Sequence, residues 1–529
     1  MITLACLLVL LLPGDPPTAG DPAPLADPPS ATDGAKEAAP DAESEPLRIT
    51  LEDAIELARV NNLTLAGARL DAAAAVSSFN SSWGAFDTIF FSNGTWSQAN
   101  TPPQVIFVNG SPVGVNPSSN QEFAQWRTGF RGTFLTGTDW TFDVGPQKNE
   151  FNGNAQVQGD WALELTHPLL RNGADGYAQS GLELARHDAN ISSLAAETAA
   201  TDTLQSVVEA YWNLLFTRAD VKTRELSVQL ATELLDITKR KFEQGLQNRI
   251  NVTEVDAEVA LRKQELLTAV GAEGDAQDEL RRLVLAPQDS GQWNRPIELL
   301  TEPAPAQQRS IDVEQAIATA LLYRADVASS RESLERAEVD VRRALNQTRP
   351  LLDLTGGYGA SANDQSYGGV YNHLEDSPTF DQRHVAFVFE VPIGNRGAGY
   401  ELRRAQTARE RAGVDLREAE MNAYRDVRQA ARAVETQIAR VAATDETVRL
   451  QQETYDGEVR RLENDLSTPF QVRQTQRDLL SAIDAAKRAK LDLEIARSAL
   501  LSAEGRLPYA YGMERSLPEL SIDEAPPRP

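Results

Sequence analysis

Four histidines are the side chains of this 529-residue chain best suited to metal binding or acid–base catalysis. His167, His187, His373 and His384 are far apart in the sequence, with no pair four residues apart and no cysteine nearby. The one cysteine, Cys6, lies in the first dozen residues. Because local zinc motifs need closely spaced His and Cys ligands, the sequence predicts no metal site, and one cysteine allows no disulfide framework.

Other catalytic motifs are also missing. The glycine-rich stretch LTGGYGA is not followed by a helix start with dinucleotide-binding spacing, so it is better explained as a strand with small residues. No Ser, Cys or Thr nucleophile lies in a recognisable setting. The net charge of −26, from 77 acidic and 51 basic residues without basic clusters, argues against nucleic-acid binding. The sequence therefore predicts neither an enzyme nor a cofactor site.

The N-terminal residues are typical of an exported protein. The apolar run Ile2–Leu12 is followed by Pro, Gly and small residues, which predicts a signal peptide over residues 1–20. Residues 21–47, rich in Pro, Ala and Asp, predict a disordered linker. No later stretch is apolar over about 18 residues, so no transmembrane helix is expected. If the chain spans a membrane, it must do so with strands in a closed barrel.

The chain between its two ends repeats itself once. ITLEDAIELARVNNLTLAGAR, from Ile49, matches IDVEQAIATALLYRADVASSR, from Ile311, with apolar residues and N-cap residues in the same places. The expected first repeat is residues 48–310, with a helix, a β region at about 84–168 and a helical hairpin at about 180–286. The second is residues 311–508, with a helix, a β region at about 350–393 and a hairpin at about 400–505. A C-terminal tail over residues 509–529 ends in PELSIDEAPPRP, which is expected to be disordered.

Periodicity distinguishes the strands from the helices. Trp126, Phe130, Trp140 and Phe142 alternate with polar residues in WRTGFRGTFLTGTDWTFDV, and HVAFVFEVP alternates in the same way. Such strands occur in membrane β-barrels and in soluble sandwiches. The long polar segments instead have apolar seams at steps of three and four residues, such as Val427, Ala431, Val434, Ile438 and Val441, which predict coiled-coil helices. A helix over residues 182–244 would be about 90 Å long, so a tube or spike is expected rather than a globule.

This order of elements resembles the TolC-like outer membrane factor family. The likeness rests on the repeated helix starts, on the segments LTHPLLRNG and FEVPIGNRG that close each strand region, and on the long hairpins, and it covers about residues 48–508. The resemblance implies a mainly α fold with a membrane β-barrel, in which duplicated halves of coiled-coil helical hairpins and β-strands build a trimeric shared barrel and an α-helical tunnel.

The resemblance also implies a function without enzyme activity. It implies an exit duct of a tripartite efflux pump or type I secretion system, passively conducting small molecules or polypeptide through the cell outer membrane, with a periplasmic helical extension. The implied partners are two further copies in a homotrimer, outer membrane lipid, a periplasmic adaptor (membrane fusion protein) and an inner membrane RND or ABC transporter. The alternative is a periplasmic coiled-coil structural or adaptor protein without a membrane barrel.

The family pattern assigns the two hairpin tips to docking with the adaptor or pump. The matching residues here are Gly245, Leu246, Asp465, Leu466 and Ser467. Gly245 matches the turn glycine of the first tip, whereas Asp465 takes the equivalent place in the second and adopts a left-handed turn less readily. The two tips are therefore expected to differ in shape.

The family's tunnel constriction and membrane interface match further residues. Acidic rings of known members correspond to Gln471 and Gln474, which are neutral, so Glu254 and Asp256 beyond the first tip are added as candidates. Tryptophans gather in the first β region, where the interpretation is an aromatic belt at the bilayer interface and the alternative is ordinary sheet packing. The predicted interface aromatics are Trp83, Trp96, Trp126 and Trp140.

Overall fold

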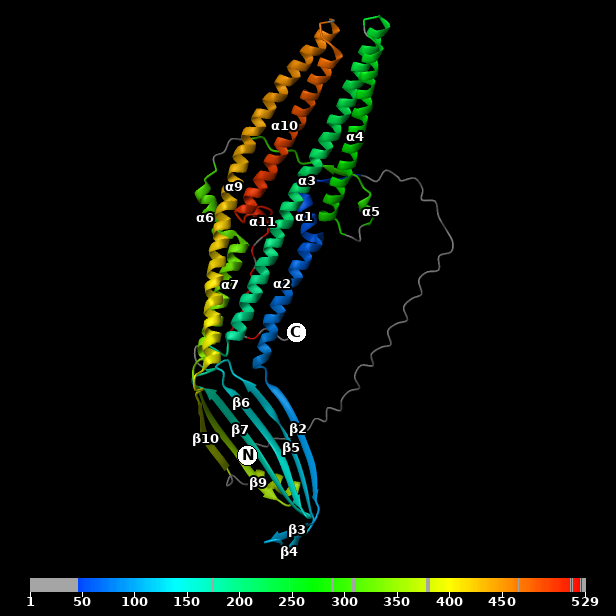
Figure 1. Cartoon of the computed structure of the whole chain (residues 1–529). Coiled ribbons are helices and arrows are strands. Elements are labelled where there is room, and N and C mark those ends of the chain that lie inside the picture. The colour runs from blue at the N-terminus through cyan, green and yellow to red at the C-terminus, as the bar shows by residue number, and fades with distance from the viewer. Residues whose placement is uncertain are drawn as a thin grey trace, which may run out of the picture. The chain divides into compact units, whose positions relative to one another are not determined.

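A computed structural model gives the structure of the chain (Figure 1). It describes residues 46–529 apart from gaps at 174–175, 247, 287–289, 307–310, 377–380, 465, 514, 516, 524 and 526–529. The expected signal peptide and nearly all of the expected linker lie outside the described residues. Residues Leu47–Pro529 form one unit, and everything that follows concerns this unit alone.

The first half contains short helices, then strands, then two long helices. Its elements are β1 (Leu47–Ile49), α1 (Leu51–Asn61), α2 (Leu63–Ser82), the 3-10 helix η1 (Trp83–Phe86), β2 (Ile89–Thr101), β3 (Gln104–Val108), β4 (Ser111–Asn116), β5 (Ser119–Thr133), β6 (Asp139–Phe151), β7 (Asn154–Pro168), α3 (Ser180–Glu243), α4 (Arg249–Val284), α5 (Ser290–Trp293) and β8 (Ile297–Leu299).

The second half repeats this order with fewer strands. Its elements are α6 (Val313–Tyr323), α7 (Ala325–Gln347), β9 (Leu351–Asp364), α8 (Tyr367–Asp376), β10 (Asp381–Glu390), α9 (Arg396–Glu463), α10 (Pro469–Ala503) and α11 (Leu507–Ala510).

The two halves begin with equivalent helices, so the duplication predicted from the sequence is confirmed. Helices α1 and α6 each have 11 residues and bury Ala, Ile and Ala at matching positions. Thr50 and Asp53 form a capping box, in which each side chain accepts a hydrogen bond from the other residue's backbone N–H. Asp312 caps α6 through the backbone N–H of Gln315. Local capping and an apolar stripe therefore fix both starts in the same way.

The long helices pack as two hairpins, α3 with α4 and α9 with α10 (Figure 1). Near the hairpin tips, Leu234, Val255, Leu462 and Val472 form one apolar cluster with a residue from each of the four helices. The predicted seam on α9 is buried at four of its five positions, and Ile438 is half-buried. Burial along these seams holds the hairpins together, since their outer faces are charged. No helix in the described part of the chain is long and apolar enough to cross a membrane.

The strands form a six-stranded antiparallel sheet with the order β10-β9-β7-β6-β5-β2. The first half contributes four strands and the second half two. Strands β3 and β4 form a separate hairpin between β2 and β5 in the sequence, and β1 pairs in parallel with β8. Because the side chains of a strand alternate between its two faces, this register sorts all the residues of the sheet onto two sides.

The C-terminal tail differs from the expected disorder. The guanidinium of Arg515 donates two hydrogen bonds to the carboxylate of Glu197 on α3, at 2.8 and 3.0 Å. Further on, Leu520 and Ile522 pack against the apolar cluster around α2 and the start of α3. The prediction was wrong for these residues because composition alone did not reveal partners on helices more than 300 positions away.

Candidate functional site

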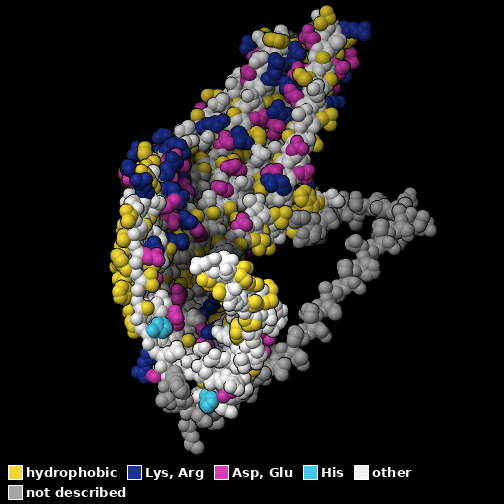
Figure 2. All heavy atoms as spheres, turned by 60° about the horizontal axis from the view of Figure 1, so that its bottom comes forward, with side chains coloured by type: hydrophobic (Ala, Val, Ile, Leu, Met, Phe, Trp, Pro, Cys, Tyr) yellow, Lys and Arg dark blue, Asp and Glu magenta, His cyan; other side chains and the backbone are white. Residues whose placement is uncertain are grey.

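One face of the sheet is apolar and exposed. Register places Phe90, Phe130, Phe142, Leu163 and Tyr358 in one row across five strands, and these side chains are between 37% and 63% exposed. Exposed Val, Phe and Leu side chains on β9 and β10 continue the same face. Figure 2 shows hydrophobic side chains gathered along one side of the strand region. Soluble monomers rarely expose an apolar patch of this extent, so the face is suited to lipid or to a protein partner.

The opposite face of the sheet is charged. Arg127 on β5 forms ion pairs with Asp143 on β6 and with Asp160 on β7, the second at 2.7 Å. Register also brings Glu164 and His384 to this face. The sheet is therefore amphipathic, with one apolar face and one charged face.

Tryptophans lie near both limits of the apolar face. Trp96 on β2 is paired with Ala124 on β5, and Trp140 on β6 is paired with Gly132 on β5. These two partners are eight residues apart on β5, which is about 26 Å along the strand. The apolar band of a membrane barrel is about 25 Å tall. The indole of Trp96 donates to Glu122 at 3.3 Å, as expected of an aromatic side chain with one polar end at an interface.

The other two predicted interface aromatics differ from each other. Trp126 is 57% exposed on the same apolar face and lies over Gly94, where an added Cβ would come within 2.9 Å of the indole. Trp83, in contrast, is only 7% exposed and packs with Phe79 and Leu182 between α2 and α3. The interface prediction is therefore wrong for Trp83, because this indole is enclosed by helices and does not belong to the sheet.

The first hairpin tip is a defined helix end. Gly245 has φ +75°, and its N–H bonds to the carbonyl of Phe242 while the N–H of Leu246 bonds to that of Lys241. This is the Schellman arrangement, which requires a left-handed residue at the place of Gly245. Asn248 then caps the returning helix by accepting a hydrogen bond from the backbone N–H of Asn251 at 2.9 Å.

The second tip shares one backbone bond of this turn with the first tip, but its returning helix begins differently. Asp465 lies outside the described residues, while the N–H of Leu466 bonds to the carbonyl of Arg461 at 2.8 Å. The hydroxyl of Ser467 donates to Gln471 at 3.0 Å, and α10 begins with Pro469. Leu246 and Leu466 are 57% and 70% exposed, so each tip presents an apolar side chain to solvent.

The constriction candidates lie just behind the tips on α4 and α10. Gln471, Gln474, Glu254 and Asp256 are all exposed. Glu254 forms an ion pair with Arg473 at 3.4 Å, which links the two hairpins. The amide of Gln474 donates to Asp478 at 3.2 Å. The exposed Asp478 was not among the predicted residues, although its position one turn after Gln474 is visible in the sequence.

A part-buried polar cluster joins α3 to α10 farther from the tips. Arg224 forms 3.0 Å ion pairs with Asp220 on its own helix and with Asp484 on α10. The ammonium of Lys487 donates to the carbonyl of Ala219 at 3.0 Å. Burial raises the pKa of Asp484 and lowers the pKa of Lys487. Nothing in the local sequence singled out this cluster, since its partners are about 260 residues apart.

The four histidines also have neighbours that sequence spacing did not reveal. His167 contacts the hydroxyl of Thr138 at 2.8 Å, and His384 lies on the charged face of the sheet. His373 is 3.6 Å from the carboxylate of Asp364. His187 is buried on α3 beside two glutamates of α7, which is the one possible metal-ligand group in the described part of the chain.

Comparison with known proteins identifies the family. A family model described as outer membrane efflux protein matches residues 150–284 and 316–506, which is more than half of the chain. The chain belongs to the outer membrane efflux protein family. The two matches fall on the two halves of this family member, in agreement with its duplicated fold.

Solved structures of outer membrane channels share the fold of this family member. The CmeC outer membrane channel of Campylobacter jejuni superposes with a TM-score of 0.63 at 16% identity, covering 88% of this chain and 86% of that one. VceC from Vibrio cholerae superposes with a TM-score of 0.63 at 17% identity, covering 86% of this chain and 96% of VceC. The open state of MtrE from Neisseria gonorrhoeae superposes with a TM-score of 0.60 at 17% identity, covering 86% of this chain and 89% of MtrE. No curated protein sequence matches. The predicted TolC-like fold class is confirmed.

Proposed function

We propose that the chain is an outer membrane channel that forms the passive exit duct of an efflux pump or secretion system. The observation that carries the proposal is the family match in both halves of the chain. The amphipathic sheet and the long helical hairpins support it, because together they supply a wall for lipid and a conduit for water.

We further propose that three copies share one barrel. Within the described sheet, β2 and β10 are the edges, and open edges in lipid leave backbone groups without hydrogen bonds. Three six-stranded sheets joined edge to edge make 18 strands, a size at which a barrel encloses a water-filled channel. The row containing Phe130 then faces lipid, and Arg127 with its two aspartates faces the lumen.

The helical hairpins form the periplasmic extension in this proposal. Their tips, with Leu246 and Leu466 exposed, dock with a periplasmic adaptor and an inner membrane transporter of the RND or ABC class. The alternative, a periplasmic coiled-coil or adaptor protein, is less favoured because it would leave the exposed aromatic face of the sheet in water.

The proposal is tested by placing one charge on either face of the same strand. Phe387 is 76% exposed on the apolar face of β10, and Ala386 is the next residue on the opposite face. We expect Phe387→Lys to impair stable insertion, since a lysine on the lipid-facing side of a membrane strand is destabilising, by about 2–4 kcal/mol at the bilayer midplane and by less toward the interfaces. Ala386→Lys should insert normally.

The measurement is fractionation followed by gel migration with and without heating. The wild-type chain should be found in the outer membrane as a heat-modifiable trimer that conducts ions in planar bilayers. A soluble periplasmic monomer, or equal behaviour of the two lysine variants, would contradict the channel proposal.

A further inference from the structure

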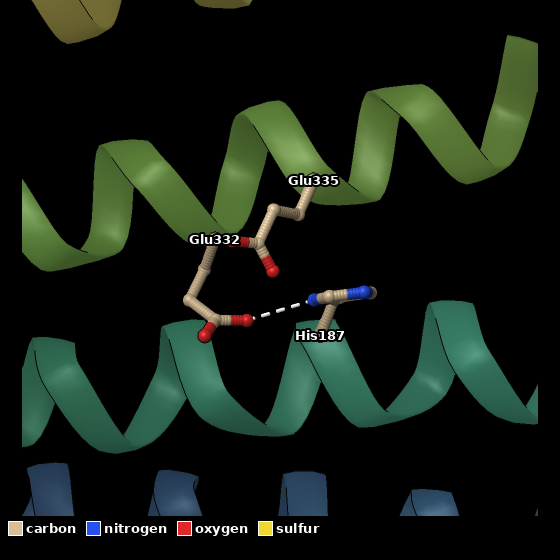
Figure 3. A group of neighbouring side chains, drawn as sticks. All are labelled: His187, Glu332 and Glu335. Carbon is tan, nitrogen blue, oxygen red and sulfur yellow. Dashed lines mark hydrogen bonds and ion pairs between the residues drawn. The ribbon is translucent and has the colours of Figure 1, made fainter.

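Three potential metal ligands come together between the two halves of the fold (Figure 3). His187 lies on α3, and Glu332 and Glu335 lie on α7, with one ligand atom of each residue within 4.8 Å of the other two. The two glutamates are three residues apart, so their carboxylates project from the same side of α7.

Two of the three ligands are held in place by hydrogen bonds. His187 Nδ1 is 2.7 Å from Glu332 Oε2, and the amide of Asn190 donates to the same oxygen at 3.3 Å. The imidazole is buried, with 5% of His187 exposed. The bond from Asn190 is an outer hydrogen bond of the kind that orients ligands in metal sites.

Glu335 has a different environment. Its side chain has no hydrogen bond or ion pair with any residue that the structure describes, yet Figure 3 shows its carboxylate turned toward His187 and Glu332. Two carboxylates that approach each other repel unless a cation lies between them. Glu335 is exposed, so water can hydrate its carboxylate, and a cation between the two carboxylates would offset their repulsion.

The surroundings favour a cation. A cavity of about 630 Å³ lies beside the cluster and is lined by Glu183, Arg186, His187, Glu335, Glu338, Val339 and Arg342. Arg342 is paired with Glu183, and Glu338 is paired with Arg409 at 2.9 Å. With Glu332 included, carboxylates outnumber the guanidinium groups at the cavity. The cavity also provides room for a water ligand.

We propose that His187, Glu332 and Glu335 bind a divalent transition-metal cation, for which Zn²⁺ is the best match. One imidazole nitrogen and two carboxylate oxygens are ligands that Zn²⁺ accepts, whereas Mg²⁺ and Ca²⁺ prefer oxygen alone. Bond lengths of about 2.0–2.2 Å separate two ligands of a tetrahedral zinc by roughly 3.4 Å. Small side-chain rotations therefore bring the three atoms into range, and water takes the fourth position.

The bound cation would connect α3 of the first half to α7 of the second. Three metal bonds would replace the hydrogen bond between His187 and Glu332, and they would add to the ion pairs that Arg336 and Arg342 of α7 already form with Asp188 and Glu183 of α3. The site would therefore stabilise the packing of the two halves against each other, independently of what the protein transports.

The test is a Zn²⁺ titration of the metal-free, detergent-solubilised full chain against a chromophoric chelator. We expect one site per chain that millimolar Mg²⁺ does not displace. Glu335→Gln should weaken this site at least tenfold, and His187→Gln should abolish it. Glu410→Gln removes the same charge from an exposed position on α9 and is the matched control, which should bind as the wild type does.

Two further readouts identify the ligands. Zn²⁺ should raise the melting temperature of the wild type and of Glu410→Gln but not of Glu335→Gln. Loading with Co²⁺ should give visible absorption bands that change when His187 is replaced. If His187→Gln does not fold, Glu335→Gln decides, since Glu335 is exposed and its side chain has no hydrogen bond or ion pair to lose among the described residues. Equal Zn²⁺ affinity of Glu335→Gln and wild type, or no site in the wild type, would overturn the proposal.

Discussion

Gly245 is the residue on which the shape of the first hairpin tip depends. Its φ of +75° lies in the left-handed region, and an added Cβ would meet no atom of the described residues within 4 Å. Replacing it by valine therefore acts through the backbone alone, at a cost of about 1–2 kcal/mol or a rearranged turn. We predict that Gly245→Val reduces export in a susceptibility assay while the trimer still assembles.

The control for this prediction is a glycine with the same free space and an ordinary helical backbone. Gly271 on α4 also has no atom within 4 Å of an added Cβ, so Gly271→Val should leave export unchanged. If Gly245→Val exports as well as Gly271→Val does, the first tip is not the docking surface.

The structural roles of residues were predictable from the sequence where their contacts are local, but not where their contacts join distant parts of the fold. Gly245 and the Thr50 cap were visible because a turn or a helix start involves only neighbours. His187 and Glu332 are 145 positions apart, and no spacing rule reaches that far. Trp83 was placed in the wrong environment because it directly precedes the first strand, and sequence order does not show that helices cover it.

At the scale of elements, the contact between α3 and α10 depends on pH. Burial raises the pKa of Asp484 above its ordinary value of 3.8, while Arg224 opposes this shift. Between 3.8 and the raised pKa, the folded chain binds a proton that the unfolded chain releases. The stability contributed by this carboxylate therefore falls as pH rises through that window. Without Arg224 the window would extend to higher pH.

We therefore predict that Arg224→Gln is destabilising mainly at high pH. The loss should be about 1–2 kcal/mol at pH 8, since Asp484 then remains charged, part-buried and less compensated, with one oxygen that already lacks a hydrogen bond. At pH 4 the loss should shrink because the carboxylate is protonated. Thermal unfolding at the two pH values measures this difference.

A matched control separates this effect from the loss of any arginine. Arg282 pairs with Glu279 three residues earlier, and both side chains are more than half exposed. Arg282→Gln should change stability by no more than a few tenths of a kcal/mol at either pH. A pH-independent loss in Arg224→Gln would contradict the role given to Asp484.

Elements were predicted well where periodicity extends over many residues. The α9 seam and the two faces of β5 and β6 followed from steps of three and four and from alternation. Two features did not follow. The tail docks through single side chains such as Arg515, and the pairing of β3 with β4 joins short segments without a distinctive alternation.

At the scale of the whole molecule, the edges of the sheet determine whether a closed assembly forms. Strand β10 is an edge in the described sheet, so alternate backbone N–H groups point away from β9 and remain available to a neighbouring copy. Val385 and Ala386 are consecutive, so their backbone N–H groups point to opposite sides of β10. A proline at one of them therefore removes an N–H donor to β9, and a proline at the other removes an N–H donor that points outward.

We predict that both Val385→Pro and Ala386→Pro weaken the trimer, because a shared barrel uses both rows of hydrogen bonds. Heat-modifiable migration and the mass of the detergent-solubilised protein should report monomers for both variants. Gly114→Pro on β4 is the control, since that hairpin is separate from the six-stranded sheet and its loss leaves both edges intact. If the trimer is weakened only by the proline that removes a hydrogen bond to β9, then β10 remains an edge in the native assembly. In that case three copies do not close an 18-stranded barrel through this strand.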